Sequence, residues 1–216
     1  MIEMKTFDSR EEWLQARKSF IGGSDASSIV GMNPYKSNVE LWLEKTGQYQ
    51  PEDISDKPYV RYGHDAEEHL RALYALDHPE MQVFYEDNNM WLNDRYPFGH
   101  VSLDGWLMDE EGRQGVLEIK TTEILRSRQK EDWRDRIPEN YYVQVLWEME
   151  MFEAEFAVLV AQLKSTFEGI LYKQVKEYKI ERCDVQQDID YLMQEAAKFS
   201  ECIRTKRRPD LILPAI

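Results

Sequence analysis

The feature that most constrains the fold of this chain is a pair of short apolar segments, residues 100–107 and 116–120. They flank the turn-forming run Asp109-Glu110-Glu111-Gly112. Two such segments joined by a short glycine-containing turn are typical of a β-hairpin. If the hairpin is centred on Glu111, residues at equal distances from that position face each other. The sequence therefore predicts both the hairpin and its register.

This register brings charged groups together at one end of the hairpin. Asp104 falls opposite Glu118, and strand alternation places Glu118 and Lys120 on one side while Leu117 and Ile119 point into the core. Facing carboxylates repel each other unless a cation neutralises them, and Mg²⁺ is the natural candidate because it prefers oxygen ligands. The alternative is an ordinary strand pair in which Lys120 balances Glu118.

Two more polar residues lie on predicted helices. Residues 63–76 repeat apolar side chains at helical spacing, and Glu67 lies at the edge of that stripe. Residues 138–152 predict a second helix, in which Gln144 interrupts an apolar face. The amide could bind an attacking water or a phosphate oxygen, or it could be a satisfied core amide. Glu67 could be a ligand or a helix-terminal acid favoured by the dipole.

Arg17 and Ser24 form a fourth candidate group. A predicted helix over residues 10–20 carries Arg17, and the Gly22-Gly23-Ser24-Asp25 turn leads into a short helix that ends at Gly31. A guanidinium beside a hydroxyl at a helix N-terminus can hold a phosphate. Alternatively, Ser24 or Asp25 is simply the helix N-cap and Arg17 is a surface residue.

The remaining pattern predicts a mixed α/β chain. Strands are expected at residues 81–84, 89–92, 155–163 and 171–179, with helices at 38–45 and from Asp184 onward. A length of 216 residues suits one domain. Two cysteines, Cys183 and Cys202, and the lack of a long apolar run predict a reducing cytoplasmic setting without a membrane span.

The charge distribution is uneven. A net charge of −14 argues at first against a polyanionic partner, but carboxylates clustered at a metal site contribute to this total, so what matters is whether basic residues gather locally. Two stretches concentrate basic residues, and each is either a DNA contact or a solvated helix face: Arg126, Arg128, Lys130, Arg134 and Arg136, then Lys206, Arg207 and Arg208.

Four motifs in fixed order resemble the lambda exonuclease and YqaJ branch of the PD-(D/E)XK nucleases, which is found in phages and prophages. The resemblance covers about residues 10 to 152. It rests on Trp13-x-x-x-Arg17 followed by IGGSDASSIVGMNPY, on YGHDAEEHLRALY, on SLDGW leading to LEIKTT, and on Tyr141-x-x-Gln144. Leu103 stands where the superfamily pattern has proline.

The resemblance implies a restriction-endonuclease-like core, a central mixed β-sheet flanked by helices, over about residues 10–180, followed by a helix and basic tail at 184–216. It implies a Mg²⁺-dependent exonuclease with two ions, for which Mn²⁺ could substitute, acting 5′ to 3′ on double-stranded DNA ends. The products are mononucleotides and 3′ overhangs for recombination. It also implies a ring-shaped homotrimer, a single-strand annealing partner, and a phage-type origin in a bacterial host.

The resemblance also assigns roles to individual residues. Its metal ligands fall on Glu67, Asp104, Glu118 and the Ile119 carbonyl. The catalytic lysine and glutamine fall on Lys120 and Gln144, and the 5′-phosphate pocket falls on Arg17 and Ser24.

Three alternatives stand beside this reading. One is a nuclease of the same superfamily with different polarity, and another is a non-catalytic DNA-binding adaptor for recombination. The presence of all four of Glu67, Asp104, Glu118 and Lys120 argues against the adaptor. An iron–sulfur exonuclease fails because two cysteines cannot hold a four-cysteine cluster.

Overall fold

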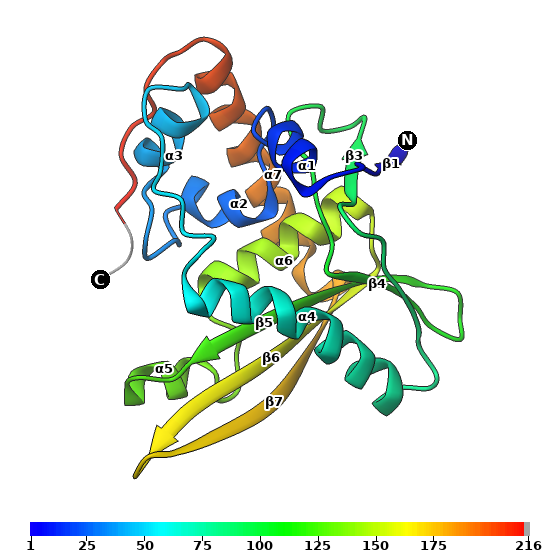
Figure 1. Cartoon of the computed structure of the whole chain (residues 1–216). Coiled ribbons are helices and arrows are strands. Elements are labelled where there is room, and N and C mark those ends of the chain that lie inside the picture. Colours follow the sequence, from blue (N-terminus) through cyan, green and yellow to red (C-terminus); the bar gives the residue numbers. More distant parts are fainter. Residues whose placement is uncertain (214–216) are drawn as a thin grey trace.

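A five-stranded mixed sheet forms the centre of the protein. The computed structural model describes residues 1–213, and the strand order is β2-β4-β5-β6-β7 (Figure 1). Only β5 and β6 run parallel, and the other neighbours are antiparallel. These strands are β2 Gln82–Phe84, β4 Gly105–Met108, β5 Gln114–Glu123, β6 Phe156–Phe167 and β7 Ile170–Glu181. The predicted α/β class and mixed sheet are confirmed.

The β4–β5 hairpin has the predicted register. Gly105 pairs with Leu117 and Met108 with Gln114, so the hairpin is centred on residue 111. Gly112 has φ of +79°, a conformation that glycine adopts without strain and that closes the tight turn. The first strand is shorter than predicted, because β4 starts at Gly105 and Val101 instead forms an isolated bridge with Trp91. Asp104 therefore lies directly before the strand.

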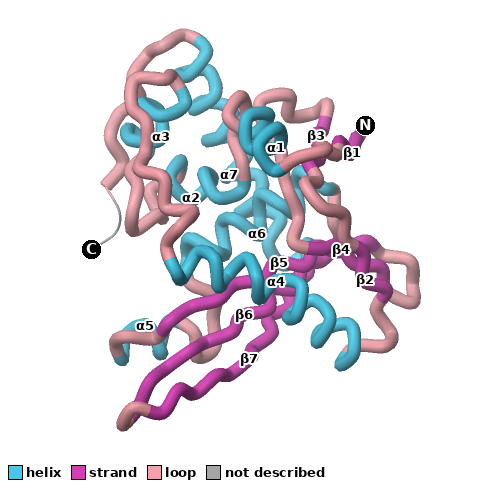
Figure 2. Tube along the Cα trace, in the orientation of Figure 1, coloured by secondary structure: helices cyan, strands magenta, loops and turns pink. Residues whose placement is uncertain are grey.

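Helix α6, Glu139–Phe152, connects β5 to β6 and covers one face of the sheet (Figure 2). Pro138 is its N-cap and not part of its first turn. The helix is buried nearly all round from Val143 to Phe152, because α2 (Gly23–Ile29) and α7 (Arg182–Arg204) pack against its other sides. This placement puts polar residues of α6 directly against the sheet.

Helix α4, Pro58–Asp77, covers the opposite face. Its buried residues, Ala66, Leu70 and Tyr74, share an apolar cluster with Leu117 and Ile119 of β5. The helix begins at Pro58, five residues before the predicted start at Gly63, because proline is favoured in a first helical turn. Strand β5 is thus buried on both faces, as strands with parallel neighbours commonly are.

Other elements differ from the prediction or were not predicted. Strand β1, Ile2–Lys5, pairs with β3, Met90–Asn93, in a separate two-stranded sheet. Helix α7 begins at Arg182 with Glu181 as its N-cap, two residues before the predicted start at Asp184. The remaining helices are α1 Arg10–Arg17, α3 Asn38–Lys45 and α5 Ser127–Asp132.

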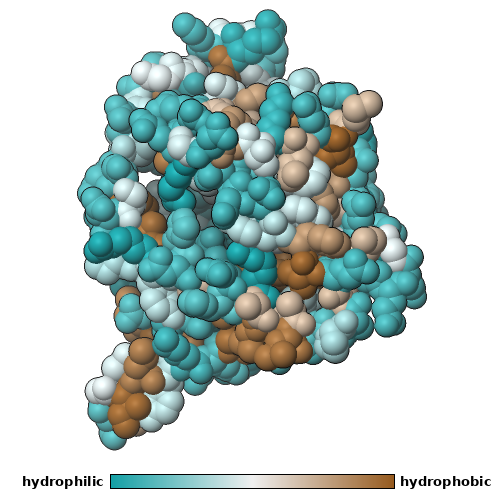
Figure 3. Space-filling model, turned by 45° about the vertical axis from the view of Figure 1, so that its right-hand side comes forward, coloured by the Kyte–Doolittle hydropathy of each residue, from teal (hydrophilic) through white to brown (hydrophobic). Residues whose placement is uncertain are grey.

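The β6–β7 hairpin extends beyond the rest of the molecule (Figure 1). Its tip carries apolar side chains on the surface, which form the brown projection at the lower left of Figure 3. The side chains exposed there are Phe167, Ile170, Leu171 and Tyr172. Within residues 1–213, no helix combines the length and apolar character needed to cross a bilayer.

Candidate active site

One pocket of about 450 Å³ is lined by every residue that the sequence assigns a catalytic, metal-binding or phosphate-binding role. It opens between the N-terminal helices, α4 and the β5 strand. Its lining includes the five candidate catalytic residues, Ile119 and both residues of the candidate phosphate clamp: Arg17, Ser24, Glu67, Asp104, Glu118, Ile119, Lys120 and Gln144. Neither of the two basic stretches of the sequence lines this pocket.

Glu118 is the most deeply buried acid among the candidate residues, with 2% of its surface exposed. Its position on β5 turns the side chain toward α6, where Gln144 Nε2 donates to Oε1 at 2.6 Å and the Lys120 ammonium also binds. Burial and the nearby Asp104 charge raise the pKa of Glu118 to about 8, although Lys120 opposes this rise. The site therefore disfavours a bare negative charge at Glu118.

Lys120 lies one pleat further along β5. Burial disfavours its charge, but the carboxylates of Glu118 and Asp104 outweigh that effect and raise the Lys120 pKa above its ordinary value. The ammonium lies 5.4 Å from the centre of the Tyr141 ring, so Tyr141, one turn before Gln144, makes a cation–π contact with Lys120. Lys120 is therefore a positioned, charged group at the pocket.

Asp104 is held by backbone contacts at the start of β4. Its Oδ2 accepts a hydrogen bond from Ile119 N–H at 2.9 Å, and Arg71 donates to the Asp104 carbonyl. Asn89 fixes the preceding residue, because its side-chain amide forms 2.9 Å hydrogen bonds with both the N–H and the carbonyl of Leu103. These bonds set the direction of the Asp104 side chain.

Glu67 reaches the same pocket from the middle of α4. Burial and the charge of Asp104 raise its pKa to about 7, while Lys120 and Arg71 act in the opposite direction. Glu67 therefore interacts electrostatically with Asp104, although Glu67 lies on a helix at the other side of the pocket. Its central place in α4 rules out the helix-terminal explanation.

Gln144 lies between two acids. Its Nε2 donates to Glu118 at 2.6 Å and to Glu148 at 2.8 Å, so both amide protons bind carboxylates. Glu148 is 1% exposed, and burial together with the Glu118 charge raises its pKa well above the ordinary value. Glu148 follows Gln144 by four residues on the same face of α6, and this spacing alone does not show that the two side chains are bonded.

Arg17 enters the pocket from the end of α1. Its guanidinium lies over the Trp13 ring at 4.1 Å from the centroid, and Trp13 Nε1 donates to the Asn89 carbonyl at 2.9 Å. Burial lowers the pKa of Arg17, and Asp25 partly offsets that effect. The arginine is therefore fixed by an aromatic platform and is not a mobile surface residue.

Ser24 lies in the first turn of α2 and is exposed to the pocket. The predicted N-cap at Ser24 or Asp25 is wrong, because the N-cap of α2 is Gly22. Asp25 Oδ2 accepts a hydrogen bond from the Gly22 N–H at 3.0 Å. The Ser24 hydroxyl is consequently not used in capping. Sequence reasoning could not separate these neighbours, since both residue types favour caps.

The acids offer oxygen ligands and little compensating charge, which is the chemistry that suits a hard divalent cation. Burial and the charge of Asp104 raise the pKa of both Glu67 and Glu118, and the nearby Lys120 only partly offsets this rise. In residues 1–213, however, no three acidic, histidine or cysteine side chains are gathered closely enough to hold an ion. In this arrangement the Glu118 carboxylate is bonded to Lys120 and Gln144. The residue types fit a metal, and the metal site stays a prediction.

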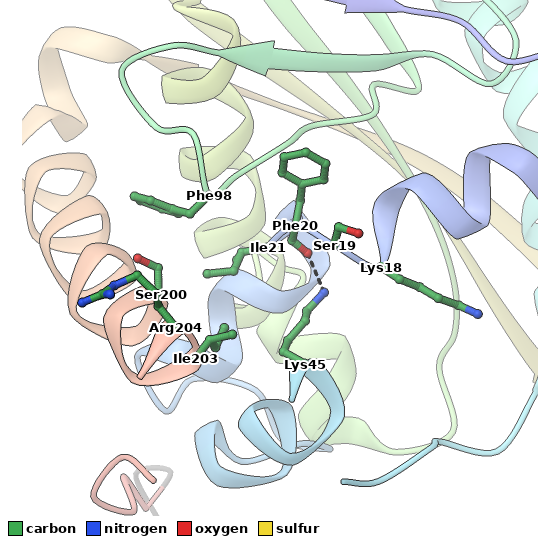
Figure 4. Close-up of a pocket in the computed structure, with 9 residues that line it drawn as sticks. All are labelled: Lys18, Ser19, Phe20, Ile21, Lys45, Phe98, Ser200, Ile203 and Arg204. Atoms are coloured by element: carbon green, nitrogen blue, oxygen red, sulfur yellow. Dashed lines mark hydrogen bonds between the residues drawn. The ribbon is translucent and has the colours of Figure 1, made fainter. Parts of the chain in front are cut away.

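A second, smaller pocket of about 160 Å³ lies where α7 approaches the segment before α2 (Figure 4). Phe20, Phe98 and Ile203 line it together with Lys45, whose ammonium is bound to the Phe20 carbonyl at 2.7 Å and to Asp25. No acid lines this pocket. It therefore lacks the groups that hydrolysis or metal binding requires.

Comparison with known proteins gives a consistent picture. The model of the YqaJ-like viral recombinase domain matches residues 12–155. The uncharacterized protein YqaJ of Bacillus subtilis strain 168 is 34% identical over 182 residues, covering 75% of this chain and 50% of the relative. The chain thus spans about half the length of the curated relative that it matches.

Solved structures of low sequence identity share the fold. An alkaline exonuclease from Laribacter hongkongensis matches with a TM-score of 0.63 at 18% identity, over 92% of this chain and 96% of that one. A phage-related exonuclease from Haemophilus somnus 129PT matches with a TM-score of 0.57 at 13% identity, over 87% and 96%. The chain therefore shares its fold with these two exonuclease structures. With the family model matching well over half of its length, the chain belongs to the YqaJ-like viral recombinase family.

Proposed function

We propose that this protein is a metal-dependent exonuclease that degrades one strand of double-stranded DNA from its 5′ end. The observation that carries the proposal is the convergence of Glu67, Asp104, Glu118, Lys120 and Gln144 in one pocket, from two helices and a hairpin. Two proteins that share the fold are described as exonucleases, which supports the same activity.

The chain's own groups would divide the work of phosphodiester hydrolysis. A divalent cation, Mg²⁺ or in its place Mn²⁺, would be held by Glu67, Asp104, Glu118 and the Ile119 carbonyl, and would supply a water of lowered pKa. Lys120 would neutralise charge that develops on the phosphate. The Gln144 amide oxygen, free of protein partners within residues 1–213, would accept a hydrogen bond from the attacking water.

The 5′ polarity rests on Arg17 and Ser24. Both line the pocket that contains the acids, and the Trp13 platform holds the guanidinium in place. A terminal 5′ phosphate bound by these groups would present the first phosphodiester to Lys120 and Glu118, so that mononucleotides leave and a 3′ overhang remains. If Arg17 and Ser24 do not bind a 5′ phosphate, the 5′-to-3′ polarity is supported by the family resemblance alone, and a nuclease of different polarity is the alternative.

The proposal extends to partners and setting. A homotrimeric ring would allow basic residues to face DNA while the outer surface stays acidic, which reconciles a net charge of −14 with a polyanionic substrate. On α5 and its flanks, Arg126, Arg128, Lys130 and Arg134 are exposed and form no ion pair with residues 1–213. A single-strand annealing protein would use the 3′ overhang, in the cytoplasm of a bacterial host.

The test is an end-labelled linear duplex incubated with protein and Mg²⁺, with EDTA as the control. We expect release of a 5′ label as mononucleotide and loss of the reaction in EDTA. Release of the 3′ label first would reverse the polarity, and DNA binding without any cleavage would favour the adaptor.

A further inference from the structure

We propose that Glu148 is a positioning residue, which fixes the side-chain amide of Gln144 so that its oxygen faces the reacting groups. This inference rests on the proposed nuclease function and adds a residue that no motif includes. Glu148 follows Gln144 by one turn of α6 and does not itself line the pocket, but it binds Gln144 and interacts with the charge of Glu118, and both of these residues line it. Its effect on the reacting groups would therefore pass through these neighbours, and the bond from Gln144 is the contact that sets the direction of the amide.

The contacts around Gln144 define the direction of its amide. A glutamine amide has two N–H donors on one side and an oxygen acceptor on the other. Glu118 Oε1 and Glu148 Oε1 accept the two donor contacts at 2.6 Å and 2.8 Å. Both contacts are made by Nε2, so the amide oxygen lies on the other side of the group and points away from the two acids. The two contacts together thus hold the amide in one orientation.

The backbone of α2 leaves room for this arrangement. A Cβ atom at Gly23 would lie 3.1 Å from Glu148 Oε1 and 3.3 Å from Gln144 Cγ, which is tighter than ordinary contact. Glycine at the first position of α2 therefore permits the Glu148–Gln144 pair to lie against the helix. Any larger residue there would push on the two side chains at once.

Glu148 is difficult to explain as a stabilising residue. It is 1% exposed, and its Oε2 has no hydrogen-bond partner in the part of the chain that the structure describes. Burying an acid with an unpaired oxygen opposes folding. An apolar residue of similar length would fill the same space without this penalty, so the carboxylate is better explained by what its other oxygen holds.

The experiment is a double-mutant cycle with Glu148→Met and Gln144→Leu. Methionine is chosen because it has similar length and is expected to fold. If Glu148 acts through Gln144, Glu148→Met lowers kcat about tenfold or more on 5′-phosphorylated duplex, with little change in KM for DNA. The double variant should then match Gln144→Leu alone, because the second change has nothing left to disturb.

Two controls separate positioning from general damage. Glu148→Gln keeps an acceptor oxygen and should recover much of the rate. Glu150→Gln alters another buried acid of α6, which binds Arg182 and Tyr96 away from the pocket, and should leave kcat unchanged. Thermal unfolding of each variant reports whether the fold persists, and Glu148→Leu replaces Glu148→Met in the cycle if the methionine variant does not fold.

A second readout does not need activity. The side-chain NH₂ signals of Gln144, identified by their loss in Gln144→Leu, should shift strongly in Glu148→Met. Any one of three results would overturn the inference. These are a wild-type rate for Glu148→Met, additive losses of rate in the double variant, and Gln144 NH₂ signals that do not shift in Glu148→Met. A wild type that cuts no DNA would instead remove the proposed function, while the NH₂ signals still decide whether Glu148 orients the amide.

Discussion

Replacing Glu118 by glutamine should abolish hydrolysis. In the absence of metal, the variant should also be more stable than wild type, by a margin that grows as pH rises. The pKa of Glu118 is raised from 4.5 to about 8 by burial and by Asp104. Below pH 4.5 the carboxyl is protonated in both folded and unfolded chains, so it adds no penalty. Between these two values the folded state holds an extra proton, and the free energy of unfolding falls as pH increases.

The size of the effect follows from how steeply the free energy of unfolding changes with pH. One retained proton lowers the free energy of unfolding by about 1.4 kcal/mol per pH unit, or about 2.7 kcal/mol from pH 5 to pH 7. This is an upper bound, since Glu67 and Glu148 interact with the same charges. Glutamine cannot ionise, so Glu118→Gln should lack this part of the pH dependence.

The assay is urea unfolding of wild type and Glu118→Gln in EDTA at pH 5, 6 and 7. The difference in the free energy of unfolding between Glu118→Gln and wild type should increase with pH, in favour of the variant. The control Glu110→Gln changes an exposed acid of the β4–β5 turn, and its difference from wild type should not increase with pH. Added Mg²⁺ should stabilise wild type more than Glu118→Gln. A gap that stays constant across this range would refute the reasoning about burial.

Three further outcomes are expected. Lys120→Ala should bind DNA ends but cut at least about 10²-fold slower in single-turnover reactions, and a loss confined to binding would make Lys120 a phosphate anchor. Arg17→Ala should erase most of the rate advantage of 5′-phosphate over 5′-hydroxyl ends, about tenfold or more, whereas equal losses on both substrates would indicate a general contact. Partial burial opposes charge on His78, but its hydrogen bonds to Glu80 and Glu177 prevail and raise its pKa. Its stabilisation should be complete below about pH 6.5 and disappear at higher pH, so His78→Asn should unfold more easily at pH 6 than wild type and almost equally at pH 9.

The sequence predicted the parts of the site that depend on short-range periodicity. The hairpin register follows from turn position alone, and it correctly brought Asp104 to the level of Glu118. The α6 helix and the side of β5 that carries Glu118 follow from spacings of 3.6 and 2 residues. The domain limits and the metal remain predictions.

What the sequence did not predict depends on tertiary packing. Strand β1 forms only because β3 lies beside it, and its four residues carry no strong strand pattern. Asn89 and Trp13 support the pocket through contacts across 76 residues of chain. A polar residue whose partner is distant in sequence looks like any other loop or helix residue, so Asn89 was not singled out and Trp13 was noted only as part of a motif.

The position of β5 explains why this site contains acids that oppose folding. Its neighbours Val116 and Leu117 are fully buried, and Glu118 lies in the same strand with both faces covered. An apolar residue at position 118 would suit that environment better, since a buried charge needs a partner that Lys120 alone does not fully provide. Glu148 on the facing helix adds a second acid to the same layer. A fold that tolerates two such acids against its central strand is expected to recover the lost stability when a cation and a substrate bind, which links the cost of burying these acids to the proposed chemistry.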